Sequence, residues 1–376
     1  MVQFEKKILF ITHDYGNYGA GRSLRLILQS NSGNFSLLVP KPILRSGTDF
    51  DKVSARTRIP RERVFQRVFE PDRCYVGHIP RIQYLVTALA RDFIWKFTKK
   101  AFYHWLEKQD FDGIHLNSLM LHKFIHKDFP FVLHVRERFE GNAAHLEKNV
   151  AMTAGLIFID TITKNRLVGM NYNQSIVLPN PIDMTSCQAW PRSSIEKVLK
   201  VELSDRTVFS IVGRINDSDK GVGFIVRTFK SLQTEKALLL IFGCGHAQDE
   251  RTIRQLAGSD PRIKFVGEVE DQGLIYSATD VLLRGENFFS LGRTVFEGLY
   301  AGCAVVVPGR AEEIQGVQEL SPFRSLVHGY APRDESELGN ALKGLMGFRN
   351  RGLQHGGKNV EMYSKAFFDF LRICGR

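Results

Sequence analysis

Short apolar runs alternate with helix-length amphipathic segments along most of the chain. Apolar runs flanked by helices are typical of parallel strands buried on both faces, and their alternation with helices predicts βαβ units in an open α/β sheet. A first series of predicted strands covers residues 6–12, 35–39, 111–117, 130–135 and 154–160. A second series covers residues 207–212, 237–242, 263–267, 280–284 and 303–308.

The strand and helix rhythm pauses over residues 178–194, a stretch with three prolines that is typical of a linker. We therefore predict an α/β protein of two doubly wound, Rossmann-like domains, residues 1–180 and 181–356, that face a central cleft. Ligands of such sheets lie beyond the carboxyl ends of the strands.

Composition narrows the class of protein. With 43% hydrophobic residues in 376, the chain can bury a sizeable core. Its five cysteines include no C-x-x-C pair, which indicates a reducing compartment without a disulfide framework or a zinc cluster. The N-terminal apolar run is too short for a signal peptide, and no stretch approaches the ~18 apolar residues of a membrane span. We expect a cytoplasmic protein.

Positive charge is concentrated in the first half of the chain. Residues 1–180 hold 26 basic and 16 acidic residues, whereas residues 181–376 hold 25 and 24. Residues 52–100 hold 12 basic and 4 acidic residues. The first half therefore faces an anionic partner or carries charge for solubility. Nucleic acid is not the expected partner, because no groove-tracking motif or stacking repeat is present.

A long amphipathic helix is predicted over residues 79–106. Apolar residues recur in it at helical spacing, and basic residues lie beside them. The apolar residues of this stripe are Ile82, Leu85, Leu89, Phe93, Phe97 and Ala101. Three aromatic residues, Trp95, Phe102 and Trp105, fall outside this stripe. We predict that residues 56–105 contact an anionic membrane surface. The alternative is a helix that faces the core and has a solvated basic face.

Two cations bracket a predicted helix start in the second half. The strand 207–212 leads to Gly213 and Arg214, and Lys220 follows after a polar loop. A helix N-terminus offers free amides, and flanking cations suit a diphosphate. The alternative is a solvated loop with ordinary surface charges.

A second group of candidate residues follows the strand that ends near residue 284. Glu286 lies in the loop, and Gly292 permits close approach of a ligand to the backbone. The amides of Arg293 and Thr294 lie at the next helix start, where they can cap phosphate oxygens. Glu297 lies about one turn further on and can accept both hydroxyls of a ribose. The alternative for Glu297 is a surface acid stabilised by the helix dipole.

The order VGR…KG, IFGCG…RIKFVGEV and GRTVFEGLYAGCAVVV over residues 205–310 resembles the GT-B glycosyltransferases of family 4, which are retaining and metal-independent. The resemblance implies a nucleotide diphosphate sugar, with UDP or GDP, held by the C-terminal domain without a cofactor. It assigns the diphosphate to Arg214 and Lys220, the ribose to Glu297, and the nucleobase to the strand end at Val266. It also implies that residues 357–376 form a helix packed on the N-terminal domain.

One departure from the family concerns its first glutamate. The family has seven residues between two glutamates, and counting back from Glu297 reaches Phe289. Glu286 lies three residues earlier. Either the loop is extended and Glu286 contacts the sugar, or the first glutamate is absent; we predict the extension.

Two segments of the first half also resemble the family. Residues 12–28 are similar to its Gly-Gly-Ala loop, which places Gly19 and Ala20 near the donor phosphate or sugar. FVLHVRERFEG resembles its strand that ends in a sugar-contacting histidine. Either His134 or Arg136 occupies that position. We predict His134, with Arg136 and Glu137 at the edge of the cleft, although a lone histidine is more often part of a core.

The expected activity is retaining transfer of a sugar from a nucleotide diphosphate sugar to an acceptor hydroxyl, with Arg214, Lys220 and His134 as catalytic residues. The acceptor is expected to be an anionic or lipid-linked glycan, in assembly of a bacterial surface polysaccharide or glycolipid. The alternatives are a sugar-nucleotide epimerase of the same fold, a basic nucleic-acid-binding protein and a catalytically inactive scaffold.

Overall fold

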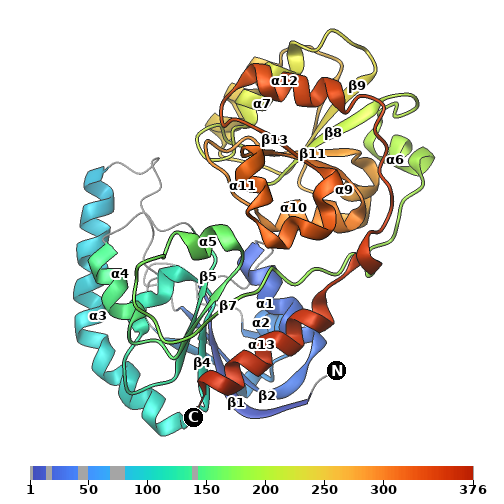
Figure 1. Ribbon diagram of the computed structural model, residues 1–376. Helices are drawn as coiled ribbons and strands as arrows, with labels where there is room; N and C mark the ends of the chain where they lie inside the picture. Colours follow the sequence, from blue (N-terminus) through green and yellow to red (C-terminus); the bar gives the residue numbers. More distant parts are fainter. Residues whose placement is uncertain (1–2, 14–18, 41–49, 68–80, 138–142, 376) are drawn as a thin grey trace. The chain divides into compact units, whose positions relative to one another are not determined.

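The computed structural model describes residues 3–13, 19–40, 50–67, 81–137 and 143–375 (Figure 1). The chain divides into two compact units. Unit 1 comprises Met1–Pro181 together with Val360–Arg376, and unit 2 comprises Ile182–Asn359. Part of the predicted membrane contact, residues 68–80, lies outside the described residues.

Unit 1 contains a parallel sheet in the order β3-β2-β1-β4-β5-β6-β7. Its strands are β1 Gln3–Ile11, β2 Ser32–Pro40, β3 Val64–Arg67, β4 Gly113–Leu116, β5 Phe131–Val135, β6 Gly155–Phe158 and β7 Ser175–Val177. β3 and β7 fall outside the predicted strands. The chain runs outward in both directions from the neighbours β1 and β4, so the topological switch point lies between them.

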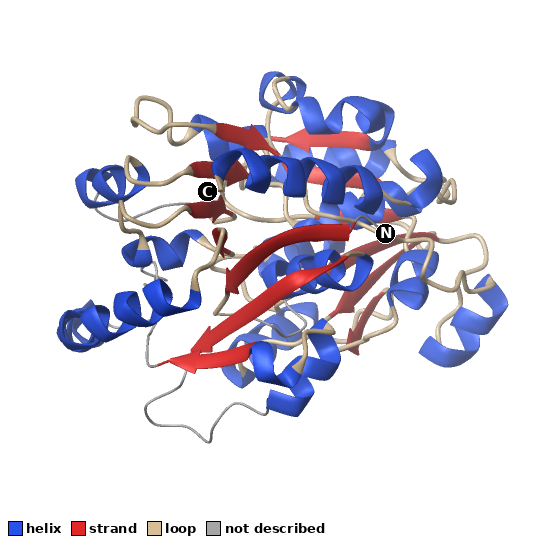
Figure 2. Cartoon of the chain, turned by 90° about the horizontal axis from the view of Figure 1, so that it is seen from below, coloured by secondary structure: helices blue, strands red, loops and turns tan. Residues whose placement is uncertain are grey.

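Helices cover both faces of this sheet (Figure 2). They are α1 Gly19–Ser30, α2 Phe50–Thr57, α3 Arg81–Gln109, α4 Ala143–Val150, α5 Thr161–Asn165 and α13 Val360–Cys374, with short 3-10 helices η1 Arg61–Arg63 and η2 Leu119–Phe124. One face packs against α1 and α13, and the other packs against α3, η2 and α4. Because both faces are covered, both side-chain rows of the strands are apolar.

α13 supplies large aromatic side chains to the core of unit 1. Phe367 is fully buried. Its ring lies 5.7 Å from that of Tyr363, 5.2 Å from Phe368 and 6.3 Å from Phe10 on β1. The helix is therefore part of this core although it follows unit 2 along the chain.

The apolar stripe of α3 and its other aromatic residues lie in different surroundings. Phe93 and Phe97, from the predicted apolar stripe, are 65% and 67% exposed, and their ring centroids lie 4.7 Å apart. Trp95 and Phe102, from outside that stripe, pack into the core of unit 1 with Phe124. The helix has apolar residues on two faces, and the bulkier aromatic face meets the sheet.

Unit 2 contains a second parallel sheet, in the order β10-β9-β8-β11-β12-β13. Its strands are β8 Thr207–Val212, β9 Ala237–Phe242, β10 Ile263–Gly267, β11 Val281–Leu283, β12 Ala304–Pro308 and β13 Val327–Tyr330. β13 falls outside the predicted strands. The switch point lies between β8 and β11, which pair side by side at Phe209 and Val281.

The helices of unit 2 alternate with its strands, as predicted. They are α6 Arg192–Leu199, α7 Val222–Lys230, α8 Ala247–Ala257, α9 Gln272–Ala278, α10 Arg293–Ala301, α11 Ala311–Gln315 and α12 Glu335–Gly344, with 3-10 segments η3 Gln318–Leu326 and η4 His355–Gly357. No helix in the described part of the chain is long and apolar enough to cross a membrane. Two parallel sheets with interleaved helices confirm the predicted α/β class.

We expect Phe367→Ala to lower the free energy of unfolding of unit 1 by about 3–5 kcal/mol, because it leaves a cavity among aromatic rings. Ile373→Ala on the same helix is the control. Ile373 is 64% exposed, so its change is expected to stay within about 0.5 kcal/mol. Urea unfolding followed by tryptophan fluorescence in a Trp190→Phe background reports unit 1 through Trp95 and Trp105. Equal losses in the two variants would contradict a core role for α13.

Candidate functional site

The predicted diphosphate cations follow β8, and the predicted sugar-binding loop follows β11. These strands are neighbours at the switch point of unit 2. The carboxyl ends of neighbouring parallel strands meet at one edge of a sheet, so the two loops come together there although they are far apart in sequence.

The loop after β8 is shaped by Asn216. Its side-chain oxygen accepts hydrogen bonds from the amides of Asp219 (3.2 Å) and Lys220 (2.9 Å). Gly221 follows with φ +61°, and a Cβ there would lie 1.7 Å from the carbonyl oxygen of Gly285. Only glycine fits this conformation and this approach. The contact fixes the Lys220 loop directly against the loop after β11.

Lys220, Arg284 and Glu286 form a charged cluster across the switch point. Glu286 is 2% exposed, and its Oε1 lies 3.3 Å from Lys220 Nζ. Arg284 donates to both carboxylate oxygens, with Nε at 3.1 Å from Oε2 and Nη2 on Oε1. The bidentate geometry makes this the stronger of the two ion pairs.

The pKa values in this cluster reflect burial and mutual attraction. Burial by itself raises the pKa of Glu286, but the Arg284 and Lys220 cations lower it more, so its pKa lies below the ordinary value. Burial and the Arg284 charge lower the pKa of Lys220, and Glu286 offsets part of that decrease. Glu286 is therefore held ionised and stabilises two cations.

Arg284 also reaches the start of α10. Its Nη1 donates to Thr294 Oγ1 at 2.7 Å. A Cβ on Gly292 would lie 2.9 Å from the same Nη1, so the glycine makes room for this guanidinium. Close approach of a ligand at Gly292 stays a prediction; the neighbour seen in the structure is Arg284.

Glu297 is buried in unit 2, with 1% of its surface exposed. Its Oε2 accepts a hydrogen bond from the Tyr276 hydroxyl at 2.7 Å. Its Oε1 accepts from Arg293 Nε at 2.6 Å and from Gln272 Nε2 at 3.4 Å. The ribose role of Glu297 stays a prediction. A ribose hydroxyl would have to share or replace these donors.

The remaining predicted donor residues lie at strand ends of unit 2. Gly213 and Arg214 directly follow β8, and both are exposed. Val266 is partly buried near the end of β10. Phe289, where the family has its first glutamate, is 7% exposed, and its ring lies against Gly309.

In unit 1 the structure places His134 inside the core face at the end of β5, with no exposed surface. Its Nδ1 lies 3.2 Å from Arg136 Nη2 and 3.2 Å from His115 Nε2. Arginine can only donate, so Nδ1 of His134 is an acceptor and the proton of its ring lies on Nε2. Burial and the Arg136 charge hold the pKa of both histidines well below the ordinary value.

The other predicted residues of unit 1 lie around this histidine. Gly19 and Ala20 begin α1, and the Ala20 carbonyl accepts a hydrogen bond from Asn117 Nδ2 at 3.2 Å. Glu137 accepts from Ser118 Oγ at 2.7 Å and from the Leu119 amide at 2.9 Å. Sugar contact by His134 stays a prediction, and it requires His134 to become accessible.

Several residues of these two clusters were not singled out in the sequence. They are Thr12, His115, Asn117 and Asn180 in unit 1, and Asn216, Tyr276 and Arg284 in unit 2. The signal available for Arg284 is a charged residue at the end of an apolar strand, two positions before Glu286.

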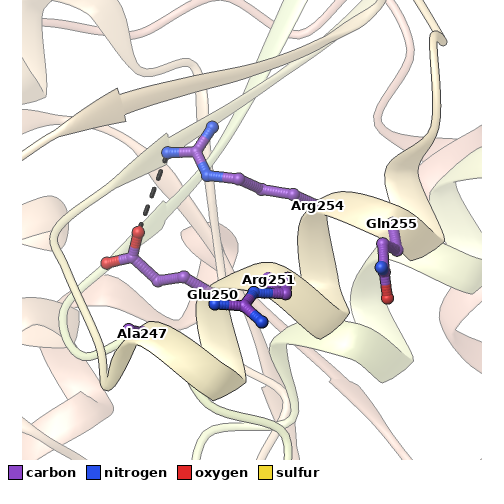
Figure 3. A pocket seen from close by; sticks show the side chains of 5 residues that line it. All are labelled: Ala247, Glu250, Arg251, Arg254 and Gln255. Carbon is purple, nitrogen blue, oxygen red and sulfur yellow. Dashed lines mark ion pairs between the residues drawn. The ribbon is translucent and has the colours of Figure 1, made fainter.

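A shallow hollow lies along the exposed side of α8 (Figure 3). It is lined by Ala247, Glu250, Arg251, Arg254 and Gln255, and Arg254 pairs with Glu250 at 3.8 Å. All of its lining comes from one helix, and none of the predicted site residues contributes, so we assign no site to it. Within the described ranges, no group of three or more His, Cys, Asp or Glu side chains is placed to hold a metal ion.

The chain thus has two α/β units, each with a polar cluster at the switch point of its sheet. Comparison with known proteins gives a family match for part of the chain. Residues 206–347 match the family model described as glycosyl transferases group 1. The resemblance to glycosyltransferases is confirmed at this coarser level for this part of the chain, which lies within unit 2. No curated protein is similar enough in sequence to add to this comparison.

Solved glycosyltransferase structures resemble nearly the whole chain. HepE of Anabaena, in complex with UDP and glucose, has a TM-score of 0.64 at 15% identity and covers 98% of this chain and 97% of its own. Sucrose-phosphate synthase of Thermosynechococcus elongatus gives 0.64 and 15%, with 98% and 95% covered. WaaG, a glycosyltransferase involved in lipopolysaccharide biosynthesis, gives 0.60 and 14%, with 97% and 94% covered. At these identities the likeness shows the fold, which is GT-B as predicted.

We expect Glu286→Gln to lower the free energy of unfolding of unit 2 by roughly 3 kcal/mol, because two cations lose their buried carboxylate. Glu335→Gln is the control. Glu335 pairs with Arg227 at 3.2 Å but is 54% exposed, so about 0.5 kcal/mol or less is expected. Urea unfolding followed by circular dichroism measures both, and equal effects would show that the Glu286 cluster is not stabilising.

A comparison of the native protein with Glu286→Gln tests the lowered pKa of Glu286. A carboxyl group with a lower pKa in the folded state stabilises above its unfolded pKa of about 4.3, and this contribution is lost as the pH falls through the folded pKa. Between about pH 5 and pH 3 the native protein should therefore lose more stability than Glu286→Gln.

Proposed function

We propose that this protein is a glycosyltransferase whose unit 2 binds a nucleotide diphosphate sugar and whose reaction transfers the sugar to an acceptor hydroxyl. The observation that carries the proposal is the cluster at the switch point of unit 2. Lys220, Arg284 and the exposed Arg214 bring three cations to one sheet edge, where Glu286 is the carboxylate paired with two of them. Asp219 also lies near Lys220, and the cations at this edge suit an anionic diphosphate.

Each charged residue has a distinct role in the proposed donor site. Glu286 holds Lys220 in place and favours its charged form. Lys220 then acts as a point charge on the diphosphate, and Arg214 supplies a bidentate fork. The proposal gives the neutralising charge to side chains and uses no metal ion or other cofactor. UDP is the first candidate nucleotide, because HepE has been solved with it.

We further propose that transfer proceeds with retention on one face of the sugar. A double displacement needs a free carboxylate nucleophile. Glu286 is bound by two cations, and Glu297 by Tyr276, Arg293 and Gln272, so neither is free for that role. In the proposed step the acceptor oxygen bonds to the anomeric carbon as its bond to the diphosphate breaks. The acceptor proton passes to the departing phosphate oxygen.

Arg214→Ala and Lys220→Ala are each expected to weaken UDP binding by about tenfold or more, because each removes a charged partner of the diphosphate. Titration calorimetry with UDP, and with GDP in parallel, measures this. Arg251→Ala removes an exposed arginine from the hollow on α8 and should leave the affinity unchanged.

Unchanged nucleotide affinity in both variants would contradict the assignment of the cations. The reaction class is tested separately by NMR of a nucleotide sugar incubated without acceptor. An epimerised donor would favour the epimerase and contradict the transferase.

We also propose that α3 places unit 1 on an anionic membrane surface, where a lipid-linked or otherwise anionic glycan acceptor is found. Phe93 and Phe97 form an exposed aromatic pair, and the exposed residues Lys96, Lys99 and Lys100 lie on the same helix. Aromatic side chains that enter the lipid interface beside lysines are typical of peripheral binding. The part of WaaG in lipopolysaccharide biosynthesis is consistent with assembly of a bacterial surface glycan.

Phe93→Ser/Phe97→Ser is expected to weaken binding to phosphatidylglycerol vesicles by about tenfold or more, because two exposed rings no longer enter the interface. Co-sedimentation measures the bound fraction, with phosphatidylcholine vesicles and added salt as tests of charge dependence. Met362→Ser/Ile373→Ser is the matched control, since these α13 residues are 69% and 64% exposed. A contrary result is that the native protein fails to bind anionic vesicles, and that the double variant instead converts a dimer of the native protein to monomers. That result would show that the exposed face of α3 binds protein and not lipid.

A further inference from the structure

Arg136 directly follows β5 in unit 1 and is partly buried. Its guanidinium donates to three neutral acceptors. Nη1 lies 2.7 Å from Asn180 Oδ1, Nε lies 3.2 Å from Asn117 Oδ1, and Nη2 lies 3.2 Å from His134 Nδ1. These partners hold the group in one orientation but give it no ion pair. Tyr363, which lies close by, also favours its charged form.

The neighbouring carboxylate does not pair with Arg136. Glu137 is occupied by Ser118 Oγ and the Leu119 amide, and no other carboxylate in the described part of the chain forms an ion pair with Arg136. Burial lowers the pKa of Arg136, and the nearby Tyr363 and Glu137 offset only part of that decrease. A desolvated cation without an anionic partner is costly to hold.

Other arginines of this chain show how a buried guanidinium is usually neutralised. Three of them have side chains only 10% or 11% exposed, and each forms an ion pair with a carboxylate of unit 2. The pairs are Arg262 with Asp260, Arg284 with Glu286, and Arg293 with Glu297. An arginine that only stabilises the fold is expected to have such a partner. The neutral partners of Arg136 indicate that its charge is reserved for a ligand.

The partners of Arg136 are themselves fixed. Asn117 Nδ2 donates to Thr12 Oγ1 and to the Ala20 carbonyl, each at 3.2 Å. Asn180 Oδ1 also accepts from Ser23 Oγ at 3.0 Å. Such outer partners preorganise a binding group before its ligand arrives.

The position in the sheet is that of a ligand site. Thr12, Asn117 and Arg136 are the residues that directly follow β1, β4 and β5, which are successive neighbours in the sheet. The switch point of unit 1 lies between the first two of these strands. Ligands of open α/β sheets bind beyond the carboxyl ends at this place.

We propose that Arg136 is the centre of a second anion-binding site, in unit 1, which takes a phosphoryl or carboxylate group of a substrate. The guanidinium offers five donors. Three are used by Asn180, Asn117 and His134, and Tyr363 lies close to the group, so at most two donors are left for an oxyanion. The residues of this site all belong to unit 1, and the proposal does not require that unit 2 binds a donor.

The test uses the full chain with Arg214→Ala/Lys220→Ala, which removes two cations from unit 2. Titration calorimetry with inorganic phosphate, pyrophosphate and glucuronate is expected to show saturable binding of at least one probe. Binding of the phosphates identifies a phosphoryl ligand, and binding of glucuronate alone identifies a carboxylate. Adding Arg136→Gln should weaken that binding at least about tenfold, and Arg136→Lys should weaken it less, since the charge remains.

Asn180→Asp, in the same background, separates binding from folding. It places a carboxylate at the atom that now accepts from Arg136 Nη1, so we expect anion binding to be lost while the melting temperature is kept or raised. A lack of saturable binding for all three probes would overturn the proposal, as would equal binding by Arg136→Gln or Asn180→Asp. UDP affinity measured with the unit 2 cations intact reports the donor site independently.

Discussion

The buried pair of Arg284 and Glu286 is the interaction on which the cluster in unit 2 depends. Glu286 attracts Lys220 from the loop after β8, while Arg284 reaches Thr294 at the start of α10. Without the carboxylate, Arg284 and Lys220 would be two neighbouring like charges, of which Arg284 is buried. The backbone contact between Gly221 and Gly285 keeps the loops close enough for this pairing, so steric fit and charge balance act on the same few residues.

Most of the sheet architecture could be predicted, because parallel strands that are buried on both faces have uninterrupted apolar sequences. β3, β7 and β13 escaped prediction because they are short and only partly buried, so their sequences VFQR, SIV and VHGY contain no long apolar run. The orientation of α3 could not be predicted from the sequence. Helical spacing tells which residues share a face, but it does not tell which of two apolar faces meets the sheet.

The candidate site was predictable as a set of positions and not as a set of contacts. Arg214, Lys220 and Glu286 could be chosen because they follow predicted strands. The pairing of Lys220 with Glu286 joins residues 66 positions apart and depends on the order of strands in the sheet, which no local pattern records. The sequence around Arg284 does not tell whether its guanidinium is solvated or buried. The engagement of Glu297 by Tyr276 likewise depends on how α9 packs against α10.

The membership of α13 in unit 1 has a consequence for biosynthesis. During translation the strands of unit 1 leave the ribosome first, but α13, with Phe367 and Phe368, follows only after all of unit 2 has been made. Domains generally fold in the order in which they emerge. Here unit 2 can complete its core before unit 1 does. α1 belongs to the same core cluster, but the apolar surface that Phe367 and Phe368 cover is without α13 until a whole further domain has been synthesised.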